Sequence, residues 1–80
     1  MIVKNLDVAV VVECLSKEEC KIKTLEDGFK CFEFDTNESE QVVEDYYYAL
    51  RNNNCFYVDI VEYIDKKKKL HRRIRDGGDK

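Results

Sequence analysis

The most regular pattern in this sequence runs from Asp59 to Arg75 and predicts a long amphipathic helix. Asp59 is a good N-cap, and Glu62 stands three residues later, as in a capping box. Side chains suited to a buried stripe then recur at helical intervals. They are Ile60, Tyr63, Ile64, Leu70, His71 and Ile74, with the stem of Lys67 among them. Gly77 and Gly78 follow, and glycine ends helices readily.

A chain of 80 residues is expected to form one domain. Residues 1–75 are its predicted body, and residues 76–80 are a predicted flexible tail. Folding at this size buries only about 60% of the surface of the unfolded chain. We therefore expect no large internal cavity for a ligand.

Residues 7–16 suit two kinds of structure. The run Val8–Val12 has the propensity of a buried strand. The spacing i, i+3, i+4, i+7 also fits one face of a helix. The positions at that spacing are Val8, Val11, Val12 and Leu15. With Asp7 as a cap and Glu13 one turn before Lys17 as an ion pair, the helix is favoured.

Residues 20–34 predict a β-hairpin around Glu26–Gly28. A two-residue Asp-Gly turn would place Phe32 opposite Lys23 and so mix core with charge. A three-residue loop with a left-handed Gly28 keeps the apolar residues on one face. Its pairs are Ile22 with Phe32 and Cys20 with Phe34 on that face, and Lys21 with Glu33 on the other.

A second helix is predicted after the hairpin. Asn37 and Glu40 resemble a capping box, and the asparagines at 52–54 tolerate the left-handed geometry that ends a helix. Its predicted buried stripe is Val43, Tyr46, Tyr47 and Leu50, flanked by Val42 and Ala49. The expected fold is α+β: a short helix, a two-stranded antiparallel hairpin, and two C-terminal helices packed on one face of the sheet.

Charge is divided unevenly along the chain. Residues 1–65 hold 15 acidic and 6 basic residues, a formal net charge of −9. Residues 66–80 hold 2 acidic and 8 basic residues, a net charge of +6. An acidic body with one cationic helix indicates a binding surface rather than a catalytic pocket.

Motifs for chemistry are missing from the sequence. The cysteines are Cys14, Cys20, Cys31 and Cys55, and no two of them have the spacing of a zinc knuckle. His71 falls on the apolar stripe of the last helix, where a core-edge histidine is expected. The acidic residues between 33 and 45 do not form a calcium loop. We therefore expect no enzyme activity, no metal and no cofactor.

The compartment follows from the apolar runs and the cysteines. The longest apolar run, Val8–Val12, is too short to cross a bilayer, so no membrane contact is expected. We expect a cytoplasmic protein of the host cell with reduced cysteines.

Two surfaces are candidates for binding. The first combines acidic residues with a tyrosine that falls off the core stripe, and tyrosine is frequent at binding hot spots. These protein-binding candidates are Tyr48, Glu40, Glu44 and Asp45. The second surface could follow a phosphate backbone. Its nucleic-acid-binding candidates are Lys68, Lys69, Arg72, Arg73 and Arg75.

The basic helix also has a structural interpretation. Glu62 with Lys66 and Asp65 with Lys69 have the i, i+4 spacing and the order that stabilise a helix. Cations also suit a helix C-terminus. Both interpretations of the basic helix, as a binding surface and as a structural feature, stay open.

Four segments resemble a family of small domains found in phages, plasmids and prophages. They are Lys4–Ala9 at the start of a short helix, the strand Cys31–Asp35, the helical Val42–Tyr47, and Val58–Asp59 before a Lys-rich helix. The resemblance spans residues 3–75, and it differs where Ser16–Glu19 replaces the glycine usual after the first helix. It implies a mobile-element accessory protein without catalytic residues, and it favours a helix over residues 7–16.

We therefore expect a non-enzymatic protein that binds another protein. Its size and acidic balance are similar in type to phage inhibitors of host defence, such as anti-CRISPR proteins. The expected partner is a nucleic-acid-processing host system. The alternative is a small regulator that binds nucleic acid through its basic helix. Whether two chains share the stripe of the last helix as a homodimer stays open.

Overall fold

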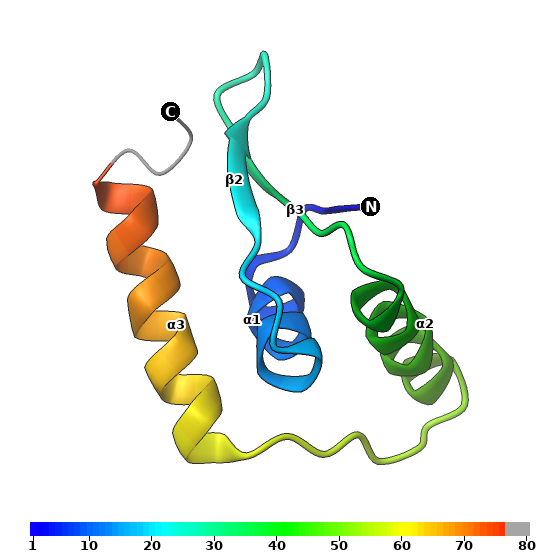
Figure 1. Ribbon diagram of the computed structural model, residues 1–80. Helices are drawn as coiled ribbons and strands as arrows, with labels where there is room; N and C mark the ends of the chain where they lie inside the picture. The colour runs from blue at the N-terminus through cyan, green and yellow to red at the C-terminus, as the bar shows by residue number, and fades with distance from the viewer. Residues whose placement is uncertain (77–80) are drawn as a thin grey trace.

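Helix α1 lies at the centre of the structure, between the two C-terminal helices and against the sheet (Figure 1). The computed structural model describes residues 1–76. Its elements are β1 (Ile2–Val3), α1 (Leu6–Ser16), β2 (Lys21–Thr24), β3 (Lys30–Glu33), α2 (Asn37–Arg51) and α3 (Ile60–Arg75). The predicted α+β class is confirmed. The sheet has three antiparallel strands in the order β1-β3-β2, one more than predicted.

The predicted hairpin register is confirmed. Ile22 pairs with Phe32 and Lys21 with Glu33. Gly28 has a φ of 86°, the left-handed geometry that the three-residue loop requires. The loop closes with a hydrogen bond of 2.8 Å from the amide of Leu25 to the carbonyl of Phe29. Cys20 and Phe34, the third expected pair, flank the strands and are both buried.

The third strand, β1, is too short for a sequence period to reveal it. Val3 pairs with Phe32, and Ile2 pairs with Glu33. The terminal amino group of Met1 donates to the carbonyl of Phe34 at 3.0 Å. Strand β3 therefore lies in the middle of the sheet, and its Phe32 is buried between Val3 of β1 and Ile22 of β2.

Helix α1 is confirmed as a helix, but its cap and its buried side differ from the prediction. The side chain of Asn5, not Asp7, accepts the cap bond from the amide of Val8 at 3.1 Å. All residues from Val8 to Cys14 are buried, whereas Leu15 is 42% exposed. A helix enclosed by a sheet and two helices is buried on several sides, so a one-sided stripe does not describe it.

The predicted ion pair between Glu13 and Lys17 is absent. Glu13 is buried and binds Arg73, whereas Lys17 binds Glu62 at the surface. Each partner comes from α3, which crosses α1 and offers closer charges than the next turn of α1 does.

The N-cap of helix α2 lies one residue before the predicted cap, Asn37. Thr36 is the N-cap, and its hydroxyl accepts from the amide of Ser39 at 3.2 Å. Ser39 and Ala49 are buried, and Val42, Val43 and Tyr46 pack against the core. Tyr47 and Leu50, which the stripe placed inside, are 41% and 62% exposed. The helix ends as predicted at the asparagines, where Asn53 has a φ of 57°.

Helix α3 has the predicted cap but buries only part of the predicted face. The carboxylate of Asp59 accepts from the amide of Glu62 at 3.0 Å. Leu70 is fully buried, and Tyr63 and Ile74 pack beside it. The remaining residues of the predicted stripe are exposed: Ile60, Ile64 and His71. The predicted stripe was too wide for a helix that packs mainly against α1.

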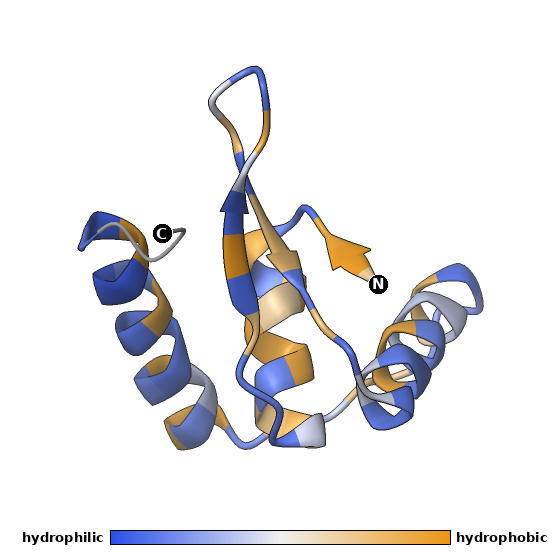
Figure 2. Cartoon of the chain, turned by 45° about the horizontal axis from the view of Figure 1, so that its top comes forward, coloured by the Kyte–Doolittle hydropathy of each residue, from blue (hydrophilic) through white to orange (hydrophobic). Residues whose placement is uncertain are grey.

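The core is continuous from β1 to α3. It joins buried residues of α1, the sheet and α3, and half-buried residues of α2 pack against it. Figure 2 shows apolar residues gathered in α1 and the strands, whereas α3 is largely hydrophilic. Asp76 caps the end of α3, and the rest of the predicted flexible tail, residues 77–80, lies outside the described residues. In residues 1–76 no helix combines the length and the apolar character needed to cross a membrane.

Candidate functional site

The outer face of α2 collects the four residues predicted to bind protein. Glu40, Glu44 and Tyr48 follow one another at intervals of four, so they lie along one side of the helix. Asp45 adjoins this row, and all four side chains are exposed. Tyr48 is 58% exposed, as the sequence predicted. We call these four residues the α2 surface.

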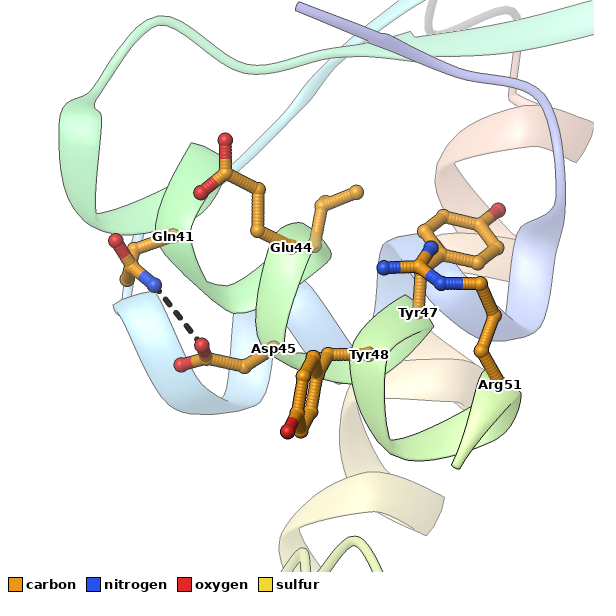
Figure 3. Close-up of a pocket in the computed structure, with 7 residues that line it drawn as sticks. Gln41, Glu44, Asp45, Tyr47, Tyr48 and Arg51 are labelled. Atoms are coloured by element: carbon orange, nitrogen blue, oxygen red, sulfur yellow. Dashed lines mark hydrogen bonds between the residues drawn. The ribbon is translucent and has the colours of Figure 1, made fainter. Parts of the chain in front are cut away.

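A shallow groove runs along the α2 surface (Figure 3). Its volume is about 550 Å³. It is lined by Gln41, Val43, Glu44, Asp45, Tyr47, Tyr48 and Arg51. Gln41 donates to the carboxylate of Asp45 at 2.9 Å near one end of the helix, and Tyr47 lies with Arg51 at the other. Because all these residues come from one helix, the groove is open and suits a partner side chain rather than an enclosed substrate.

Acidic charge on the α2 surface is not neutralised. Within residues 1–76, no ion pair joins Glu40, Glu44 or Asp45 to a cation. Arg51 is the cation that lines the groove. Carboxylates that point into water beside tyrosine rings favour contact with arginine or lysine side chains of a partner.

Glu18, in the segment between α1 and β2, holds α2 in this orientation. The sequence did not predict this role. The carboxylate of Glu18 accepts from the amides of Asp35 and Thr36 at 2.7 and 3.1 Å, and from the hydroxyl of Ser39 at 2.6 Å. These bonds stabilise the charged form and lower the pKa of Glu18 to about 2, although burial alone would raise it. The Ser39 hydroxyl in turn reaches Ser16 of α1 at 2.9 Å.

The basic candidates on α3 divide into three groups. Lys68, Arg72 and Arg75 are exposed and have no ion pair within residues 1–76. Lys69 lies 3.0 Å from Asp65, the predicted i, i+4 pair. Arg73 points inward, so it does not belong to the exposed surface that the sequence assigned to it.

Arg73 is instead part of a buried cluster. Its guanidinium contacts the carboxylate of Glu13 at 3.2 Å and the carbonyl of Cys20 at 2.7 Å. Glu13 is 2% exposed and also accepts from the amide of Cys20 at 2.9 Å. Burial raises the pKa of the Cys20 thiol to about 12, so this thiol stays protonated and is not a nucleophile. A glutamate inside an apolar run was the only sequence signal for this cluster.

A second shallow groove adjoins this cluster, between α3 and the segment after α1. Its volume is about 260 Å³. It is lined by Glu13, Glu19, Lys66, Lys69, Arg72 and Arg73. Acidic and basic side chains both line this groove, and Glu13 contacts Arg73. The groove therefore lacks the uniform positive field that would attract an anion.

The cysteines and His71, which were the other residues considered for chemistry, do not form a site. Cys14, Cys20 and Cys31 are buried free thiols, and Cys55 is exposed. In the described part of the chain, no three histidine, cysteine or acidic side chains gather as a metal site would require. His71, expected at the core edge, is exposed on α3 because this helix buries a neighbouring row.

The acidic and basic surfaces lie on opposite sides of the molecule. Helices α2 and α3 each pack against α1, which separates them (Figure 1). Comparison of the chain with protein-family models, curated proteins and solved structures finds no match.

Proposed function

We propose that this chain is a non-enzymatic binding protein that docks its α2 surface onto another protein. The observation that carries this proposal is the row of exposed, unneutralised carboxylates beside Tyr48. Tyr48 supplies a large contact area with only two side-chain torsions, and the carboxylates orient the encounter. The groove accepts one side chain of the partner between Asp45 and Arg51.

The chemistry of the α2 surface favours a basic partner. Evenly spaced carboxylates on a rigid helix present negative charge in a row, as phosphates do along a nucleic acid strand. A protein that handles nucleic acid carries a complementary basic groove. We propose that this chain occupies such a groove and so inhibits or regulates a nucleic-acid-processing system of the host, in the manner of an anti-CRISPR protein.

The biological setting forms part of the same proposal. The resemblance to domains of phages and plasmids suggests an accessory protein of a mobile element, active in the cytoplasm of its host. No catalytic group is required of the chain in this role, since inhibition follows from occupying the partner's groove.

The decisive experiment is co-purification from host lysate with matched variants. We expect the wild-type chain to retain one stoichiometric protein that binds nucleic acid, and added nucleic acid to displace the chain from it. Glu44→Lys and Tyr48→Ala should lose that partner without loss of folding. Glu26→Lys, in the exposed hairpin loop, makes the same change of charge as Glu44→Lys, so it is the control and should retain the partner. If no stoichiometric partner is retained, or if Glu26→Lys alone loses it, the proposal is wrong.

A second candidate function is nucleic-acid binding through α3, and one observation favours it. Lys68, Arg72 and Arg75 line up at intervals of four and three, exposed and without ion pairs within residues 1–76. Fluorescence anisotropy with labelled single- and double-stranded DNA and RNA tests it. Binding that weakens steeply with salt and is lost in Arg72→Glu would support it. An absence of binding even at low salt would remove it.

A further inference from the structure

An apolar patch at the start of α3 has no partner in the fold. Tyr57, Ile60, Val61 and Ile64 are 82%, 64%, 74% and 47% exposed. The three aliphatic residues share one side of the helix, and Tyr57 comes just before its cap. Single exposed apolar residues are ordinary, but four neighbouring ones on so small a chain mark a contact surface.

The charges of α3 are ordered along its axis. Acidic residues occupy the cap and the first half: Asp59, Glu62 and Asp65. Basic residues occupy the second half: Lys66 to Lys69, Arg72, Arg73 and Arg75. If two such helices pair in antiparallel orientation, the acidic half of each meets the basic half of the other. A parallel pair would place like charges together.

We propose that two copies of this chain form a homodimer by antiparallel pairing of α3 about a two-fold axis near Ile64. The patch and the charge order then belong to one self-complementary interface, as a two-fold symmetric contact requires. The patch is exposed in the described fold, and Lys68, Arg72 and Arg75 of the basic half have no ion pair within residues 1–76. Other charges of α3 also form pairs inside one copy, among them Glu62 with Lys17 and Asp65 with Lys69.

Helical spacing determines which residues meet in this arrangement. Ile64 lies beside its own counterpart. Val61 lies opposite Lys68 of the second copy, whose aliphatic stem can cover it. Tyr57 precedes the helix and lies toward the end of the second copy that carries Arg72, where a cation can stack on the ring. Lys68 and Arg72 have no ion pair within residues 1–76, so dimerisation breaks none.

The interface is small. A standard interface takes roughly 800 Å² from each partner. The patch has four apolar side chains, three of them on one face of the 16-residue helix, so we expect the contact to be smaller than this. We therefore expect a reversible dimer with a micromolar dissociation constant. The α2 surface, on the other side of α1, stays free, so the dimer would present two copies of it.

Sedimentation velocity across a wide range of protein concentrations tests the dimer. We expect the wild-type chain to pass from monomer to dimer, and Val61→Glu and Ile64→Glu to raise the dissociation constant at least about tenfold, which corresponds to about 1.4 kcal/mol. Both positions are exposed, and circular dichroism would verify that the variants fold. Leu50→Glu is the matched control, because Leu50 is 62% exposed on the other helix. It should dimerise as the wild type does.

Cross-linking tests the orientation in a Cys55→Ser background, which removes the one exposed thiol. Under mild oxidation, Ile64→Cys should form a disulfide-linked dimer. Val61→Cys alone should not, whereas Val61→Cys mixed with Lys68→Cys should. A monomer at every concentration, or variants of the patch that dimerise as tightly as the wild type, would overturn the proposal. So would loss of the dimer in Leu50→Glu, or cross-linking of Val61→Cys with itself.

Discussion

Two carboxylates, Glu13 and Glu18, hold together the segment that links α1 to the sheet. Glu13 binds the amide of Cys20 and the guanidinium of Arg73, so it ties α3 to the end of this segment. Glu18 binds the start of α2 instead. In residues 1–76 no buried side-chain nitrogen or oxygen is without a hydrogen bond, so neither burial leaves an uncompensated group.

Removing Arg73 should destabilise the fold far more than removing an exposed cation of the same helix. Arg73→Met leaves the Glu13 carboxylate buried and short of a donor, at a cost of about 2–4 kcal/mol. This is below the cost for a fully buried pair, because the Arg73 side chain is 27% exposed. Lys68→Met should cost less than about 0.5 kcal/mol. Urea denaturation measures both, and equal costs would contradict a structural role for Arg73.

Glu18 should make the free energy of unfolding depend on pH in the acidic range. Its pKa is about 2 in the fold against an ordinary value of 4.5. A depressed pKa contributes stability that is complete above the ordinary value and is lost as pH falls from about 5 toward 2. Glu18→Gln should therefore flatten this part of the pH profile. Thermal unfolding between pH 2 and 7 measures the effect, with Glu26→Gln in the exposed hairpin loop as control. An unchanged slope in Glu18→Gln would contradict the assignment.

Helix ends in this protein depend on residues just outside the periodic patterns. Asn5 and Thr36 are the caps of α1 and α2, and each precedes the residue that the sequence analysis selected. Asp7, the rejected cap of α1, instead accepts from the hydroxyl of Tyr63 at 2.9 Å and pairs with Lys67 at 3.0 Å. A residue that could cap its own helix is thus used to anchor a second helix.

The cap of α2 gives a direct test. Thr36→Ala removes the acceptor for the amide of Ser39 and a bond to Glu18, so it should destabilise the protein by about 1–2 kcal/mol. Asn37→Ala, at the predicted cap, should change stability by less than about 0.5 kcal/mol. Chemical denaturation of the two variants compares them. A larger loss in Asn37→Ala would show that the helix begins where the sequence pattern placed it.

The molecule as a whole is organised around α1. The sheet, α2 and α3 all contact this helix, and α2 and α3 lie on opposite sides of it. This arrangement separates the acidic α2 surface from the exposed cations of α3. It also explains why α1 is apolar almost throughout, whereas the two outer helices are strongly amphipathic.

Because α1 is central, we expect two of its residues to contribute very differently to the stability of the fold. Val10 is fully buried although it lies off the periodic stripe, whereas Leu15 lies on that stripe and is 42% exposed. Val10→Ala should cost about 2 kcal/mol through lost burial and a cavity. Leu15→Ala, which removes more carbon atoms, should cost less than about 1 kcal/mol. Equilibrium unfolding decides, and the reverse order would contradict the arrangement described here.

Local features of this protein were predictable from the sequence. Four of these features depend only on neighbouring residues in the chain. They are the helical character of α1, the loop at Gly28 with its register, the cap at Asp59 and the exposure of Tyr48. Turn geometry, capping and side-chain period act over a few residues, so the sequence contains the information for them. The four residues of the α2 surface also lie within three turns of one helix, so their shared face could be predicted.

Contacts between distant segments were decided only by the tertiary structure. It added the strand β1, turned Arg73 inward to Glu13, and left Ile60, Ile64 and His71 of α3 exposed. An amphipathic pattern shows that a helix has a buried side, but the width and direction of that side depend on the element that packs there. Here that element is mainly α1, a narrow helix rather than a sheet, and it covers only part of the predicted stripe of α3.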